Sequence, residues 1–170
     1  MQLIQNSSLP PAAVLAALNP EPCACILFSS YVQAGFPSPA ESYVDNALDL
    51  NQFLIPNPPS TFFVRVSGDS MNKAGLDDGD LLIVDRSLTP KNNDIVIMRI
   101  NDEFTVKRFN KQGDKFFLTP DSFNPIYKPV HPKFGQEWEV IGVVTYSIKE
   151  HCRTASQSIM LEPAIVERVC

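Results

Sequence analysis

The segment TFFVRVSGDSM, Thr61 to Met71, joins an apolar run to a serine that small and polar residues surround. The run TFFVRV is rich in β-branched and aromatic residues, which is typical of a strand. Further runs of this kind follow, separated by turn clusters: DLLIVD at 80–85, DIVIMRI at 94–100, EFTVKRF at 103–109, KFFLT at 115–119 and WEVIGVVTYSI at 138–148. Short strands without helical periods between them predict a mainly β, highly twisted antiparallel domain.

Two of these strand connections are short enough to predict tight hairpins. Asn101 and Asp102 separate DIVIMRI from EFTVKRF, and residues 112–114 around Gly113 precede KFFLT. Asn, Asp and Gly tolerate the backbone conformations that two-residue hairpin turns require. The order of the runs in the chain therefore predicts neighbouring antiparallel strands from about residue 94 to residue 119.

The composition limits the classes of function. The chain has 170 residues, 44% hydrophobic residues and a formal net charge of -5, which suits one core domain with an appendage. The negative charge disfavours nonspecific binding to nucleic acid or to a membrane surface. Cys23, Cys25, Cys152 and Cys170 show neither CxxC spacing nor histidines at zinc-ligand intervals. We therefore expect a cytoplasmic protein with reduced thiols, no metal site and no cofactor.

The first 34 residues differ from the rest of the chain. They carry one charged side chain, Glu21, and no lysine or arginine occurs before Arg65. The segment LPPAAVLAAL at 9–18 resembles the apolar part of a signal peptide, but it lacks a basic start and contains prolines. No run reaches the roughly 20 apolar residues of a membrane span. An arm of this composition cannot bury its own apolar side chains, so we expect it to dock on another surface.

Ser70 is a candidate nucleophile without an obvious histidine partner, because His131 and His151 are the only histidines and both lie in the last 40 residues. Strand alternation places Lys107 on the same face as Phe109. An exposed lysine there would be an ordinary surface residue. Burial, however, disfavours the ammonium and lowers the lysine pKa by up to roughly 3 to 5 units. A neutral amine beside Ser70 could accept its proton without a histidine.

The serine and lysine motifs together are more specific than either alone. SGDSM is followed, 37 residues after its serine, by TVKR, with GDLLIVD between them. This combination resembles the LexA/UmuD family of self-cleaving serine peptidases, and most closely its UmuD-type members. The resemblance runs from about Tyr31 to Ile148 and includes AGF, FPSPA, LDLNQ, NDIVI and VIGVV. It implies a twisted β-rich peptidase domain with Ser70 as nucleophile, Lys107 as general base and the backbone N–H groups of Asp69 and Ser70 as the oxyanion hole.

The resemblance also implies that the chain cuts itself, with Ala34-Gly35 in YVQAGF as the matching dipeptide. Small residues on both sides of the bond let the backbone enter a narrow site, and glycine allows a tight turn. Tethering raises the effective concentration of the bond to about millimolar or above for a short linker, so a slow catalyst suffices. Met71 is expected to line the substrate groove.

The function that the resemblance implies belongs to the DNA-damage (SOS) response. A RecA filament on single-stranded DNA would stimulate the cut, and the product would act as a homodimeric accessory subunit of an error-prone Y-family DNA polymerase. The alternative is a LexA-like or phage-type transcriptional regulator that the same cleavage controls. Residues 1–34 are too short for a helical DNA-binding domain and lack basic side chains, so we expect no direct specific DNA binding. A signal peptidase shares the serine and lysine chemistry but needs a membrane anchor.

These expectations divide the chain into four parts. Ser38 and Glu41 stand at the positions of a capping box, which predicts the start of a short helix or turn. The parts are an arm that self-cleavage removes, a linker with this short helix, a Ser/Lys peptidase and dimerisation domain, and a tail of unknown role, at residues 1–34, 35–60, 61–150 and 151–170.

Overall fold

The computed structural model of the chain describes residues 9–10, 13–15, 24–28 and 44–151. Its strands are β1 (Val14–Leu15), β2 (Ala24–Phe28), β3 (Val44–Asp49), β4 (Thr61–Arg65), β5 (Leu81–Asp85), β6 (Ile95–Ile100), β7 (Glu103–Gln112), β8 (Lys115–Thr119) and β9 (Trp138–Ile148). Between them lie the helix α1 (Leu50–Leu54) and the 3₁₀ turns η1 (Pro58–Ser60) and η2 (Asn72–Ala74). The mainly β fold predicted from the sequence is confirmed, and every run from Thr61 onward forms a strand.

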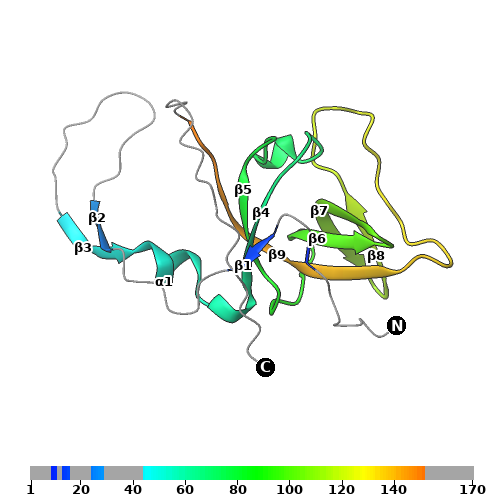
Figure 1. Cartoon of the computed structure of the whole chain (residues 1–170). Coiled ribbons are helices and arrows are strands. Elements are labelled where there is room, and N and C mark those ends of the chain that lie inside the picture. Colours follow the sequence, from blue (N-terminus) through cyan, green and yellow to red (C-terminus); the bar gives the residue numbers. More distant parts are fainter. Residues whose placement is uncertain (1–8, 11–12, 16–23, 29–43, 152–170) are drawn as a thin grey trace.

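In this part of the chain, seven strands form an antiparallel sheet in the order β1-β4-β5-β9-β6-β7-β8 (Figure 1). The hairpin of β2 and β3 forms a separate two-stranded sheet at one end of the molecule and leads through α1 into the larger sheet. Both predicted hairpins are present: Asn101 has a φ of 54° at the β6–β7 turn, and Gly113 has a φ of 61° at the β7–β8 turn.

Strand β9 joins the two halves of the large sheet. It pairs with β5 from Val143 to Ile148 and with β6 from Trp138 to Val143, and a register shift interrupts each ladder. Such irregularities increase local twist and bend a strand. Gly142 lies at this bend, where an added Cβ would come within 2.7 Å of the Val84 side chain. A residue without a side chain is therefore required for the close approach of β9 to β5.

Apolar side chains from the large sheet pack into two core clusters. The first core cluster consists of Phe62, Val64, Val66, Met71, Leu76, Leu82, Val84, Ile97 and Ile141. The second core cluster consists of Val96, Met98, Phe109, Leu118, Trp138 and Val143. Neighbouring residues of β6, Val96 and Ile97, point into different clusters, as strand alternation requires. The sheet is thus buried on both faces around β6.

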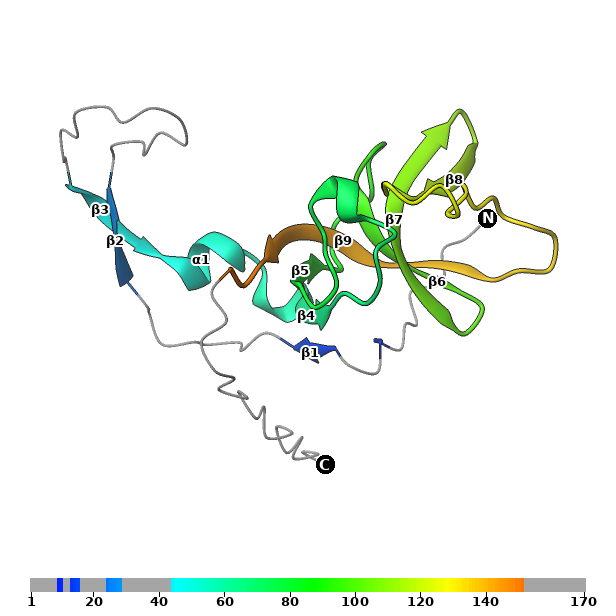
Figure 2. The same cartoon turned by 90° about the horizontal axis from the view of Figure 1, so that it is seen from above.

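Part of the N-terminal arm docks on the large sheet, as its composition predicts. Strand β1 pairs with β4, and the view from above shows it running beside that strand (Figure 2). Pro10 is buried, and Leu9 and Ala13 pack against the first core cluster. Pairing on β4 covers an edge of the sheet that would otherwise present unpaired backbone groups.

Residues 35–60, predicted as a linker, contain a strand that the sequence did not predict. Strand β3 pairs with β2, and α1 begins directly after it, with the Asp49 carboxylate accepting a hydrogen bond from the Asn51 backbone N–H at 2.9 Å. The helix start predicted at Ser38, the dipeptide Ala34-Gly35 and the tail after His151 lie outside the described residues. The four-part division of the chain therefore stays a prediction. No helix in the described ranges is long and apolar enough to cross a membrane.

Core packing predicts the effect of truncating a buried leucine. Leu82 is fully buried in the first core cluster, so Leu82→Ala should lower the free energy of unfolding by about 2–5 kcal/mol. Denaturant unfolding measures this change. The same substitution at Leu88, which is 45% exposed, should change the unfolding free energy by about 0.5 kcal/mol or less. Equal losses in the two variants would contradict the assignment of this core.

Candidate active site

Ser70 lies in a turn that connects the end of β4 to η2. Beyond the last residue of β4, the Val66 N–H donates to the Asp80 carbonyl and the Gly79 N–H donates to the Val66 carbonyl, both at 2.9 Å. Gly68 then takes a φ of 92°, a conformation that side-chain-bearing residues rarely adopt. Met71, only 2% exposed, inserts into the first core cluster. The turn is thus fixed by a ladder on one side and a core side chain on the other, with Ser70 between them.

The segment that follows β8 also binds this turn. The Asp121 N–H donates to the Ser70 carbonyl at 3.0 Å, and the Lys73 N–H donates to the Asp121 carbonyl at 2.9 Å. Asp121 itself is held by an ion pair with Arg108 of β7 at 2.7 Å. Two strands and a loop that are distant in the sequence therefore define the position of the serine.

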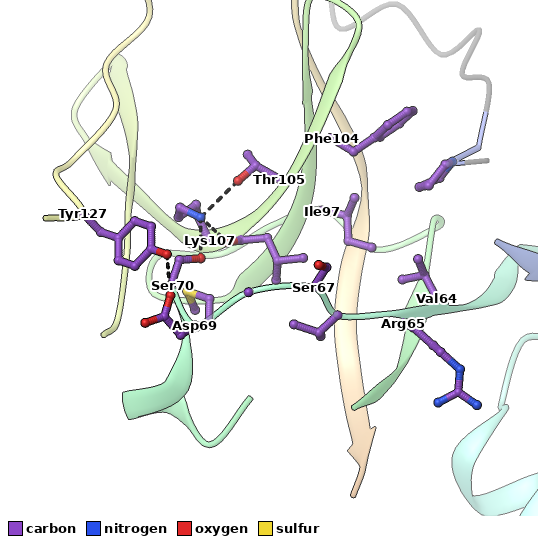
Figure 3. A pocket seen from close by; sticks show the side chains of 15 residues that line it. Val64, Arg65, Ser67, Asp69, Ser70, Ile97, Phe104, Thr105, Lys107 and Tyr127 are labelled. Atoms are coloured by element: carbon purple, nitrogen blue, oxygen red, sulfur yellow. Dashed lines mark hydrogen bonds between the residues drawn. The ribbon is translucent and has the colours of Figure 1, made fainter. Parts of the chain in front are cut away.

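Lys107 of β7 points its amino group at Ser70 (Figure 3). Its Nζ lies 2.7 Å from Ser70 Oγ, 3.0 Å from Thr105 Oγ1 and 2.9 Å from the Val106 carbonyl oxygen. The residue is buried, with 9% of its surface exposed. The alternation predicted from the sequence places Lys107 and Phe109 on one face of β7, and the burial of both agrees with it.

The surroundings of Lys107 disfavour its charged form. Burial lowers the pKa of its ammonium below the ordinary value of 10.5. The three groups within hydrogen-bond distance of Nζ are hydroxyls and a carbonyl, so all are uncharged acceptors. A lysine in such an environment releases its proton more readily than one on the surface, which is the property that a general base requires.

A cavity of about 420 Å³ opens beside the two side chains. Its lining comes from β4 and the serine turn, from β6 and β7, from Tyr127 and from Pro10 of the arm. Met71 lines the cavity and also belongs to the first core cluster. Asp69 lines it as well, next to Ser70. Four of the residues predicted from the sequence, including Lys107, therefore meet in one place.

Two polar residues of this site were not identified from the sequence. Thr105 stands two positions before Lys107, so strand alternation alone places it on the lysine's face. Tyr127 donates a hydrogen bond from its hydroxyl to Asp69 Oδ1. It comes from an irregular segment between β8 and β9, where no periodic pattern indicates its neighbours. In the described residues, no group of three or more His, Cys, Asp and Glu side chains could hold a metal ion.

Known proteins resemble this chain over most of its length. The profile of the family described as Peptidase S24-like matches residues 26–145. The chain belongs to this family. It is 47% identical over 122 residues to Protein ImpA of Escherichia coli, 45% over 119 residues to Protein SamA of Salmonella typhimurium, and 41% over 120 residues to Protein MucA of Escherichia coli. The alignments cover 72%, 70% and 71% of this chain and 81% of each relative.

These matches confirm the LexA/UmuD family and the closeness to its UmuD-type members. The S24-type domain makes the chain a serine peptidase of the self-cleaving kind. The family profile starts in β2 and ends in β9, so it includes every residue of the site described above except Pro10. The hydrogen-bonded pair of Ser70 and Lys107 lies within the matched region.

Burial of Lys107 predicts a pH-dependent stability difference. Its pKa is lowered in the folded state, so protonation favours the unfolded chain, and Lys107 destabilises the fold most at pH values below that lowered pKa. Lys107→Met should therefore melt at a higher temperature than the wild type near pH 7, and the gain should shrink as the pH approaches 10.5. Thermal unfolding from pH 7 to pH 10 measures the difference. Lys111→Met, at an exposed position of the same strand, is the control and should show no such trend.

Proposed function

We propose that the chain cleaves itself between Ala34 and Gly35 through a catalytic pair of Ser70 and Lys107. The observation that carries the proposal is the 2.7 Å separation of Lys107 Nζ and Ser70 Oγ. The burial of the lysine and its lowered pKa support a role as base rather than as a surface cation.

The neighbours of Lys107 suit a neutral amine. Such an amine has two N–H donors and one lone pair, whereas the ammonium has three donors and no acceptor. The two donors can bind Thr105 Oγ1 and the Val106 carbonyl, at 3.0 and 2.9 Å. The lone pair then faces Ser70, whose O–H donates to it. In this state the serine is ready to lose its proton to the lysine.

The proposed reaction proceeds through an acyl-enzyme. Ser70 Oγ attacks the carbonyl carbon of Ala34 while its proton passes to Lys107, and backbone N–H groups at Asp69 and Ser70 stabilise the oxyanion. The bond between the Ala34 carbonyl carbon and the Gly35 nitrogen breaks, and the proton on Lys107 passes to that nitrogen. Water, deprotonated by Lys107, then attacks the ester carbonyl carbon, the bond from that carbon to Ser70 Oγ breaks, and the proton on Lys107 passes to Ser70 Oγ. The products are residues 1–34 with a free carboxylate and residues 35–170 with a free amino group.

For the cellular role, we propose an SOS protein whose shortened form serves translesion DNA synthesis. The family membership and the UmuD-type relatives support it. In this proposal a RecA filament on single-stranded DNA stimulates cleavage in the cytoplasm. The product, a homodimer, binds a Y-family DNA polymerase as an accessory subunit.

The position of the cut can be tested by incubating the purified chain with an activated RecA filament. Mass spectrometry should find fragments that end at Ala34 and begin at Gly35. Ser70→Ala and Lys107→Ala should each reduce the cleavage rate by about 10³-fold or more, because the first variant lacks the nucleophile and the second lacks the base that activates it. A cut at another bond, or an unchanged rate in a folded variant, would contradict the assignment.

The role of Lys107 as base can be tested by spontaneous cleavage without any filament. The neutral fraction of the amine rises about tenfold per pH unit below its pKa, so the rate should rise from pH 7 and level off before pH 10.5. A gel-based time course across this range measures the profile. A histidine base would level off at roughly pH 6 to 7. A flat profile in the folded protein would exclude Lys107 as the titrating group.

A further inference from the structure

We propose that Tyr127 is a positioning residue for self-cleavage, which holds the turn that carries Ser70 through a hydrogen bond to Asp69. The inference rests on the proposed function of Ser70 and deepens it. Tyr127 and Asp69 both line the cavity that contains Ser70 and Lys107. Figure 3 shows the phenol hydroxyl directed at the Asp69 carboxylate, with Ser70 beside it.

The position of this bond relative to the serine gives it a distinct effect. The segment after β8 also binds the turn at Ser70 and beyond: Asp121 N–H to the Ser70 carbonyl, and Phe123 N–H to Asn72 Oδ1, both at 3.0 Å. Tyr127 instead reaches the residue before the serine. Residues 121–127 therefore bind the chain both before and after Ser70, and the Tyr127 bond supplies the contact on the N-terminal side of the serine.

The N-terminal side of the serine is where the turn needs an additional anchor. Gly68, at a φ of 92°, places little restriction on the backbone, and its N–H is bound by the Asp78 carboxylate at 2.8 Å. The peptide group between Asp69 and Ser70 follows it and carries one of the N–H groups proposed for the oxyanion hole. Fixing the Asp69 side chain limits rotation of this peptide. Preorganised donors of this kind are a large source of rate acceleration.

The bond also controls where the Asp69 charge lies. A carboxylate next to an oxyanion hole would oppose the negative charge that develops during the reaction. The hydrogen bond from Tyr127 lowers the pKa of Asp69 and raises the pKa of the phenol. The carboxylate is thus occupied by the phenol, whose pKa is raised, whereas the pKa of Lys107 is lowered.

Four variants of the full chain, with a fifth as control, test this inference by their first-order rates of spontaneous cleavage at the alkaline plateau. Tyr127→Phe and Asp69→Ala should each cleave measurably more slowly than the wild type, by up to about 10-fold, since each loses a hydrogen bond to a charged group. Asp69→Asn keeps an acceptor oxygen and should cleave faster than Asp69→Ala. The double variant of Tyr127→Phe with Asp69→Ala should be no slower than either single variant, because both remove one interaction. Tyr146→Phe, at the exposed end of β9, is the matched control and should cleave normally.

Amide hydrogen exchange of the peptide over residues 67–73 gives a readout that does not depend on cleavage. The inference predicts faster exchange there in Tyr127→Phe than in the wild type, with exchange in β5 and β6 unchanged. A wild-type cleavage rate in Tyr127→Phe, additive losses in the double variant, or unchanged exchange would each overturn it. If the wild type itself does not cleave under any condition, the proposed function fails, and the exchange comparison still decides whether Tyr127 holds the turn.

Discussion

The contact between the Lys107 amine and the Ser70 hydroxyl depends on keeping a lysine away from water. A buried ammonium without a counter-ion is unfavourable, and Lys107 compensates for lost hydration with hydrogen bonds to neutral oxygens only. The strand supplies two of these oxygens, from Thr105 and Val106, and the turn after β4 supplies the third. The position of the serine is therefore part of what makes the burial of the lysine tolerable.

Much of the fold follows from the sequence because the strands of the main sheet have one local signature. Runs such as DLLIVD and DIVIMRI are apolar and β-branched, and their turns contain residues that permit unusual backbone angles. Strand β3 lacks this signature: VDNALD contains two acids and an amide, and it forms because β2 pairs with it. Pairing partners of this kind are a property of the tertiary structure, so no local pattern indicates them.

Some residues of the site could likewise be predicted from local sequence patterns, and others could not. The pairing of Ser70 with Lys107 could be predicted from the two motifs that contain them. Thr105 could have been found from strand alternation alone. Tyr127 could not, because it lies in an irregular segment and reaches Asp69 across 58 residues of sequence. The twist of the sheet and the bend at Gly142 bring these elements together, and both depend on close packing between strands.

The central position of β9 has a consequence for the order in which the molecule forms. Ser70 belongs to the half of the sheet built on β4 and β5, Lys107 to the half built on β6 and β7, and β9 pairs with both halves. Leu81 pairs with Ile148, a separation of 148 − 81 = 67 residues, and such non-local contacts form slowly. During synthesis, β9 leaves the ribosome after all other strands of the sheet. A nascent chain therefore carries Ala34-Gly35, the dipeptide proposed to be cut, for most of its synthesis before the strand that unites Ser70 and Lys107 exists.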